Sequence, residues 1–134
     1  MRLVESARAA VQLCWLRARL PGILARTPLD AVLRELTPAR TSAAFTDVER
    51  AVDRAEAFAD RVPGLRRSCL YRELARYAVF RSFGCDPAFV LAVHPKGVEE
   101  DGHAWLEFSG VPYREPRADE FVVSFRFPKT PSAA

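Results

Sequence analysis

The spacing of apolar residues changes once along the chain, near Gly84. Before Gly84, apolar residues recur every three or four positions, which is the period of an amphipathic helix. After Gly84 they alternate with their neighbours, which is the period of a β-strand. A chain that forms helices first and strands second favours an α+β fold, in which a helix packs on one face of an antiparallel sheet.

The first predicted helix covers residues 3–19 and is expected to stop at Pro21-Gly22. Its apolar positions share spacings of three and four and predict one buried face. They are Leu3, Ala7, Ala10, Val11, Cys14, Trp15 and Ala18.

Three more helices are predicted before the change of period. The second covers residues 28–36, and the third begins at a capping box, residues 46–49, and runs to about residue 61. The fourth runs from Cys69 to about residue 83, with Ser68 as its N-cap. Cys69 is therefore expected in the first turn of the fourth helix.

Three runs with a two-residue period follow, at residues 89–93, 103–108 and 121–127. The connections at residues 95–97 and 109–110 are rich in turn-forming residues, and short turns join antiparallel neighbours. The sequence therefore predicts an antiparallel sheet after the fourth helix.

The length and composition are those of one domain, because 134 residues with 49% hydrophobic content can bury an ordinary core. We expect a single domain over residues 1–134. It is divided into a helical part, 1–62, a part with the fourth helix and the sheet, 63–127, and a tail, 128–134.

The charge of the chain excludes some partners. Lys and Arg total 20 against 17 for Asp and Glu, a net charge of +3, and the basic residues are scattered among acids. No basic groove with aromatic residues is indicated, so we expect no nucleic-acid partner. Charged residues interrupt residues 3–20 before they reach membrane-spanning length, and no signal peptide is indicated. We expect no membrane partner and a cytoplasmic location.

The three cysteines, Cys14, Cys69 and Cys85, are odd in number and widely spaced. This pattern fits neither a disulfide framework nor a paired zinc site, so reduced thiols are expected. A zinc site that combined Cys69 and Cys85 with His94 and His103 would have suitable ligand types but no recognised spacing. We expect no metal and no cofactor.

Cys69 and His103 are the residues best suited to nucleophilic chemistry. A helix N-terminus carries about half a positive charge and favours a thiolate, which is the reactive form of cysteine. An imidazole beside that thiol would supply the base. From spacing alone, a small buried residue in a helix remains an alternative interpretation of Cys69.

A carboxylate that orients the imidazole would complete such a site, and two candidates follow His103. Glu107 lies on the same strand face, but four strand residues separate the two α carbons by about 13 Å. Glu115 lies in the following loop and can fold back. Trp105 shares the face of His103, and it is expected in the core or at the wall of a cleft.

Two motifs carry a resemblance to a known family. The first is Cys69-Leu70-Tyr71-Arg72-Glu73-Leu74-Ala75, and the second is Gly102-His103-Ala104-Trp105-Leu106-Glu107, with Gly110 shortly after. Over residues 60–118 the chain resembles the lasso peptide leader-peptidase family, the transglutaminase-like maturation proteins.

The resemblance implies a papain/transglutaminase-like fold and a Cys-His-Asp triad that cleaves the leader from a ribosomally synthesised precursor peptide. Cys69 and His103 match the first two positions, and Glu115 stands about where the family has its aspartate. The resemblance also implies a macrolactam synthetase as a partner. The residues before Cys69 are helical and few for a β-rich winged-helix recognition domain, so a separate leader-recognition protein is expected.

Two alternatives keep the fold and change the chemistry. A transglutaminase-like enzyme can pass the acyl group to an amine instead of water. A non-catalytic member would only bind peptide or scaffold a synthetase.

Overall fold

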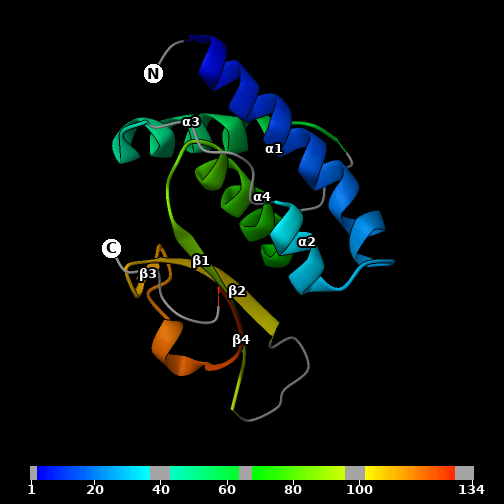
Figure 1. Cartoon of the computed structure of the whole chain (residues 1–134), viewed down its shortest axis with the longest axis vertical. Coiled ribbons are helices and arrows are strands. Elements are labelled where there is room, and N and C mark those ends of the chain that lie inside the picture. The colour runs from blue at the N-terminus through cyan, green and yellow to red at the C-terminus, as the bar shows by residue number, and fades with distance from the viewer. Residues whose placement is uncertain (1–2, 37–42, 64–67, 96–101, 129–134) are drawn as a thin grey trace.

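The structure is a computed structural model that describes residues 3–36, 43–63, 68–95 and 102–128. The helices are α1 (Leu3–Leu24), α2 (Leu29–Glu35), α3 (Phe45–Ala59) and α4 (Cys69–Ser82). The strands are β1 (Pro87–Val93), β2 (Gly102–Phe108), β3 (Val111–Tyr113) and β4 (Val122–Phe127), with a short 3-10 helix, η1 (Ala118–Glu120), before β4. The helices gather on one side of the sheet, which confirms the predicted α+β fold (Figure 1).

The sheet has the order β3-β2-β1-β4, and its neighbouring strands are antiparallel. β1 and β2 pair along their full length, from Pro87 opposite Phe108 to Val93 opposite Gly102. The predicted turn at residues 109–110 is a tight hairpin in which Ser109 and Gly110 have φ of 52° and 80°. A two-residue turn in which both residues have positive φ matches the right-handed twist of the two strands that it joins. The hairpin leads into β3, which has only three residues and was not predicted.

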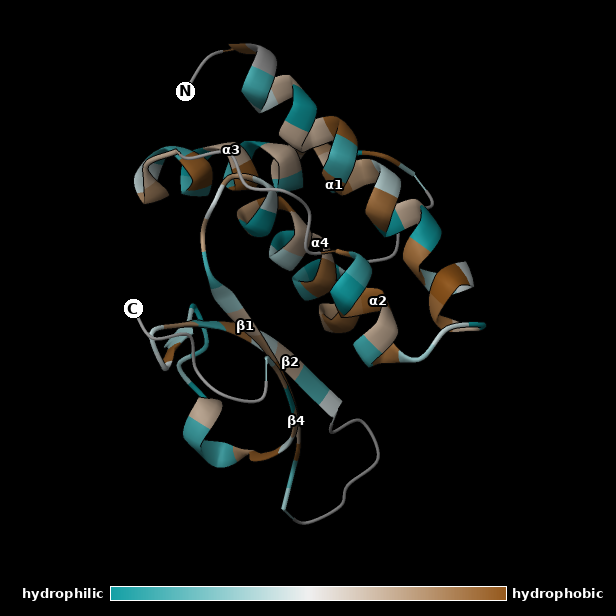
Figure 2. Cartoon of the chain, in the orientation of Figure 1, coloured by the Kyte–Doolittle hydropathy of each residue, from teal (hydrophilic) through white to brown (hydrophobic). Residues whose placement is uncertain are grey.

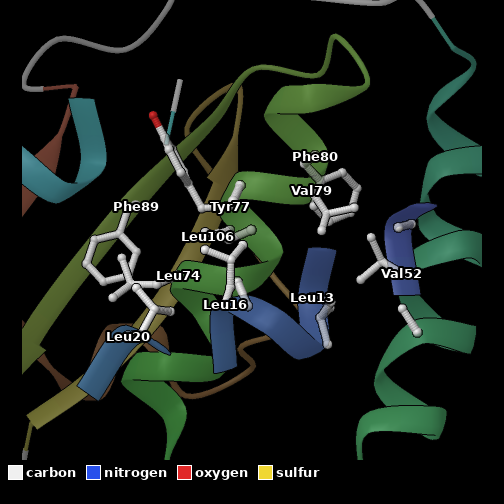
Figure 3. Close-up of a cluster of buried hydrophobic side chains, with 14 of the residues drawn as sticks. Leu13, Leu16, Leu20, Val52, Leu74, Tyr77, Val79, Phe80, Phe89 and Leu106 are labelled. Atoms are coloured by element: carbon white, nitrogen blue, oxygen red, sulfur yellow. The ribbon is translucent and has the colours of Figure 1, made fainter. Parts of the chain in front are cut away.

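The main core is formed by the four helices together with one face of the sheet, against which α4 packs. Alternation along β2 directs Ala104, Leu106 and Phe108 to this face, where they join the apolar residues of α4 and α1. Phe80 of α4 packs edge to face on Phe108, with ring centroids 5.0 Å apart (Figure 3 shows part of this core). This packing fixes the axis of α4 relative to β2.

The opposite sheet face carries a second, smaller cluster. Val90, Ala92 and Trp105 are buried there, and Ala118 and Phe121 of the β3–β4 connection cover them. The side chain of His103 belongs to this face, because His103 and Trp105 are two residues apart on β2. The β3–β4 connection therefore packs close to His103.

The buried face of α1 differs from the predicted one. Ala9, Leu13, Leu16 and Leu20 are buried, whereas Leu3, Val11 and Trp15 are exposed. The helix has apolar residues on two faces, and the larger leucines select the buried one. Figure 2 shows hydrophobic residues recurring along the helix.

The predicted stop of α1 at Pro21-Gly22 is also wrong. α1 continues through Pro21, whose carbonyl accepts a hydrogen bond from the amide of Ala25 at 3.2 Å. Proline inside a helix costs about 3 kcal/mol, and burial of side chains such as Leu20 offsets that cost.

The other helix boundaries follow the prediction more closely. Ser68 caps α4 as predicted, with its hydroxyl accepting from the amide of Tyr71 at 3.5 Å. The capping box at residues 46–49 is wrong, because α3 begins at Phe45, after Ala44, without a side-chain cap. Residues 96 and 97 of the predicted turn and residues 129–134 of the predicted tail lie outside the described residues. Among the helices that the structure describes, none combines the length and apolarity needed to cross a bilayer.

Candidate active site

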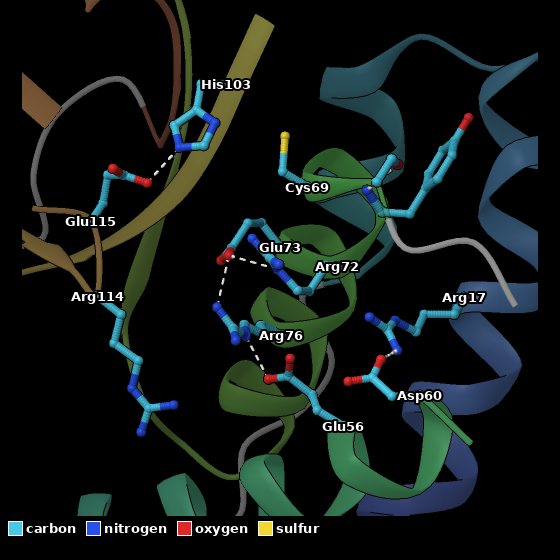
Figure 4. Close-up of polar contacts among 12 residues, drawn as sticks. Arg17, Glu56, Asp60, Cys69, Arg72, Glu73, Arg76, His103, Arg114 and Glu115 are labelled. Atoms are coloured by element: carbon cyan, nitrogen blue, oxygen red, sulfur yellow. Dashed lines mark hydrogen bonds and ion pairs between the residues drawn. The ribbon is translucent and has the colours of Figure 1, made fainter. Parts of the chain in front are cut away.

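Cys69 is the first residue of α4, where the amides of the first turn have no partners further back in the helix. Its Sγ lies 3.9 Å from the carbonyl oxygen of Gly102, the residue before His103. The N-terminus of α4 thus meets the start of β2, and Figure 4 shows the thiol pointing toward the strand that carries His103. The half-buried thiol lies in the field of a helix N-terminus, as the sequence predicted.

His103 is the second residue of β2, where the antiparallel register places it opposite Ala92. Its Nε2 contacts Oε2 of Glu115 at hydrogen-bonding distance. In Figure 4 the other ring nitrogen, Nδ1, is on the side of the ring toward Cys69. One nitrogen is therefore held by the carboxylate, and the other is on the side of the ring where Cys69 lies.

Glu115 lies in the loop after β3, and both of its oxygens are engaged. Oε2 pairs with His103, and Oε1 accepts a hydrogen bond from the backbone amide of Arg117 at 3.1 Å. The side chain is mostly buried, with 13% exposed. Of the two acids considered from the sequence, Glu115 is the one that contacts His103.

Glu107 has a different environment, although it shares a strand face with His103. Its carboxylate pairs with Arg126 of β4 and accepts from Nε1 of Trp105 at 3.2 Å. Trp105 is itself 2% exposed, which confirms its predicted place in the core. Strand geometry carries Glu107 away from His103 and into a buried polar pair.

The ring of Phe121 is a feature of the site that the sequence did not reveal. It stacks on the imidazole of His103, with centroids 5.0 Å apart and an interplanar angle of 21°. The guanidinium of Arg117 lies over the same ring at 5.8 Å. Phe121 was predicted as the first residue of a strand, and the strand period contains no signal for this contact.

The remaining cysteines and His94 have other surroundings. Burial raises the pKa of the thiols of Cys14 and Cys85, which is unfavourable for a nucleophile. His94 packs edge to face against Phe121, with centroids 6.0 Å apart. Within the described ranges, no three His, Cys, Asp or Glu side chains lie close enough to hold a metal ion.

A thiol, an imidazole and a carboxylate lie at the junction of α4 and β2, and these are the types of group that nucleophilic catalysis by cysteine uses. A carboxylate on Nε2 favours the tautomer with its proton there, which leaves Nδ1 free to act as a base. The sequence profile of the transglutaminase-like superfamily matches residues 7–126. The chain belongs to this superfamily.

The matched region includes most of α1, the other three helices and the sheet. The α+β architecture, with a cysteine-bearing helix packed on an antiparallel sheet, is consistent with the transglutaminase-like fold. Cysteine peptidases and acyltransferases both occur on that fold, and the site is compatible with either. No curated protein and no solved structure matches the chain.

Proposed function

We propose that this transglutaminase-like protein is a cysteine peptidase that removes the leader from a ribosomally synthesised precursor peptide during lasso peptide maturation. The observation that carries the proposal is the contact of His103 with Glu115 beside Cys69 at the start of α4. The motifs around Cys69 and His103 resemble those of the leader peptidases, and this resemblance is the reason for proposing a precursor peptide as the substrate.

The reaction begins when Nδ1 of His103 takes the thiol proton of Cys69. The thiolate attacks the carbonyl carbon of the last leader residue and forms a tetrahedral adduct. The adduct collapses as the C–N bond breaks, and the imidazolium returns the proton to the amine of the core peptide. The leader then remains on Cys69 as a thioester.

Water completes the cycle. His103 takes a proton from water, the hydroxide attacks the thioester, and the C–S bond breaks to release the leader as a carboxylic acid. The thiolate of Cys69 recovers its proton from the imidazolium. Through both halves, Glu115 stabilises the imidazolium and holds its orientation.

The N-terminus of α4 also provides donors for the oxyanion that forms in each half. The amide of Cys69 belongs to the first turn of the helix, whose amides have no intrahelical acceptor. Amides fixed before the reaction stabilise developing negative charge without reorganisation. We assign the oxyanion to the amide of Cys69.

The proposal includes a separate leader-recognition protein and a macrolactam synthetase as partners. In the described residues before Cys69 there are three helices and no strand, so this part provides no winged-helix sheet for a leader. A recognition protein would present the leader so that its last residue reaches Cys69. The reaction belongs in the cytoplasm, where three free thiols stay reduced.

Acyl transfer to an amine is a second candidate function. Transglutaminase-like enzymes can form the same thioester and pass its acyl group to an amine instead of water. The two reactions give products of different mass. Hydrolysis gives two fragments whose masses sum to precursor plus water, whereas transfer gives a leader joined to the amine.

The deciding experiment is cleavage of the cognate precursor by the purified chain, with and without the recognition protein, followed by mass spectrometry. Cys69→Ala is the test variant, and Cys14→Ala is the matched control, because Cys14 lies on α1, away from the site. Leader release that requires Cys69 and the recognition protein supports the peptidase. An amine adduct supports transfer, and full cleavage by Cys69→Ala would overturn both.

A further inference from the structure

Arg114 is the residue before Glu115, and it is tied to a helix far away in the sequence. Its NH1 donates to Oδ1 of Asp53 at 2.6 Å, and its NH2 donates to Oδ2 of Asp53 at 3.1 Å. NH2 also lies 3.3 Å from Oε2 of Glu49. Two parallel hydrogen bonds to one carboxylate fix the plane of the guanidinium as well as its position.

Tyr113, one residue earlier, is held by the same helix. Its hydroxyl donates to Oε2 of Glu49 at 2.6 Å. Glu49 and Asp53 are four residues apart on α3, so they lie on one face of the helix. The guanidinium of Arg114 also lies 4.9 Å over the ring of Tyr113. The last residue of β3 and the residue after it are therefore bound to one face of α3.

The backbone at Arg114 is in a conformation that favours glycine. Its φ is 53°, in the left-handed region, which is unfavourable for a residue with a Cβ. This conformation turns the chain between Tyr113, which faces α3, and Glu115, which faces His103. Strain of this kind persists only where surrounding contacts hold it, and the contacts of Arg114 with Asp53 and Glu49 are among those that surround this position.

The ion pair contributes little to folding stability. The side chains of Arg114 and Asp53 are 41% and 47% exposed, and ion pairs at such positions are weak contributors to stability. The hydrogen bonds from Arg114 lower the pKa of Asp53. The contact is geometrically specific, is a weak contributor to stability, and lies one residue from Glu115.

We propose that Arg114 is a positioning residue: clamped on Asp53 and Glu49 of α3, it fixes the loop that holds the Glu115 carboxylate against His103. This inference rests on the proposed function of Cys69, His103 and Glu115. It assigns the N-terminal helices a role in the chemistry, because α3 supplies the anchor for the acid loop. None of the clamp residues touches the thiol.

Glycine is the sharpest substitution at this position. Arg114→Gly removes the guanidinium and adopts the left-handed backbone without strain, whereas Arg114→Ala removes the guanidinium and keeps the strain that a Cβ causes. Asp53→Asn removes the opposite charge with little change of shape. The control is Arg34→Gly or Arg34→Ala, at an arginine that is 70% exposed on α2 and pairs with Asp30 at 3.6 Å.

The readout is the rate of alkylation of Cys69 by iodoacetamide across a pH series, resolved from the other cysteines by peptide mass spectrometry. A carboxylate that stays beside the imidazolium favours the thiolate–imidazolium pair, and its displacement should slow alkylation near pH 7 about tenfold. Arg114→Gly and Asp53→Asn should shift the rate profile to higher pH, and Arg114→Lys should recover part of the rate. The double variant that combines Arg114→Gly with Asp53→Asn should be alkylated no more slowly than the slower single variant, because the two substitutions remove the same contact.

In precursor cleavage, Arg114→Gly should lower kcat about tenfold and leave KM unchanged, because the substrate does not touch the clamp. Its melting temperature should match that of the parent chain. Parent-like kcat and alkylation in Arg114→Gly would overturn the clamp while Cys69→Ala remains inactive. Retained cleavage by Cys69→Ala would overturn the proposed function instead, so the two failures are distinguishable.

Discussion

The imidazole of His103 and the ring of Phe121 lie face to face, with centroids 5.0 Å apart. This stacking limits the access of water to one face of the imidazole and restricts rotation of the ring. We predict that Phe121→Leu, which keeps an apolar side chain, lowers kcat for precursor cleavage about tenfold through lost orientation of the imidazole. Steady-state kinetics measured by chromatography of the products check this.

Phe58→Leu is the control for Phe121→Leu, because Phe58 is 58% exposed on α3. It should leave kcat unchanged. A Phe121→Leu enzyme with the kcat of the parent chain would show that the stacked ring does not orient His103.

The contact between His103 and Glu115 predicts an ordered series of activities. Glu115→Ala removes the carboxylate and should lower kcat at least about 100-fold, because the imidazole loses its preferred tautomer. Glu115→Gln keeps an oxygen that can accept from Nε2 and should retain an intermediate rate. Equal rates for the alanine variant and the parent chain would remove Glu115 from the mechanism.

The variant Glu107→Gln distinguishes the role of Glu107 from that of Glu115. Glu107 is buried with Arg126 and Trp105, so its loss should lower the free energy of unfolding by about 1–3 kcal/mol and leave kcat near that of the parent chain. Urea denaturation and the cleavage assay measure the two effects. A large fall in kcat with unchanged stability would instead favour Glu107 as the acid of the site.

The positions of Cys69 and His103 could be predicted because their signals are local. A serine N-cap places Cys69 in a first turn, and the two-residue period places His103 at the start of a strand. The sequence favoured Glu115 over Glu107, but the contact of Glu115 with His103 depends on the hairpin at residues 109–110 and the left-handed turn at Arg114. Those features fold the acid back, and the sequence period does not contain them.

Contacts between distant segments could not be predicted from these patterns. Arg114 and Asp53 are 61 residues apart, and the stack of Phe121 on His103 depends on how the β3–β4 connection crosses the sheet. The face of α1 was mispredicted for a different reason. Its apolar residues fall on two faces, so the helical period identifies a helix and leaves its buried side undetermined.

A buried ionic network joins α3 to α4. Arg76 donates to Glu73 at 2.7 Å and to Glu56 at 2.5 Å (Figure 4). We predict that Arg76→Met lowers the free energy of unfolding by about 3–5 kcal/mol, because it removes the cation between two buried carboxylates and leaves Glu73 only the more distant Arg72, at 3.5 Å. Urea denaturation measures this, with the exposed Arg34→Met as the control.

The same variant has an expected pH dependence. Burial already raises the pKa of Glu73 in the folded chain, and loss of Arg76 removes a charge that opposes this rise. Acidification should therefore reduce the difference in free energy of unfolding between the parent chain and Arg76→Met, here called the deficit, because protonated carboxyls do not need a cation. A deficit that grows as the pH falls toward about 5 would contradict this assignment.

The pair of Asp53 with Arg114 should contribute to stability in a defined pH range. The folded pKa of Asp53 is lowered, so its contribution is present above the unfolded value of about 3.9 and is lost as the pH falls through the folded value. The small stability difference between the parent chain and Asp53→Asn should be constant near neutral pH and shrink below about pH 4. Urea denaturation across that range measures it, and a difference that disappears near pH 7 would contradict the pairing.

The three thiols should differ in their reaction with iodoacetamide. Burial raises the pKa of Cys14 and Cys85, so at neutral pH they hold less of the thiolate that reacts, whereas Cys69 lies at a helix N-terminus beside His103. We predict that a short pulse near pH 7 labels Cys69 first, and that labelling of the other two increases only as the pH rises. Peptide mass spectrometry identifies the labelled residues. His103→Ala should slow the labelling of Cys69 and leave Cys14 and Cys85 unchanged, whereas equal slowing of all three would indicate a general change in folding.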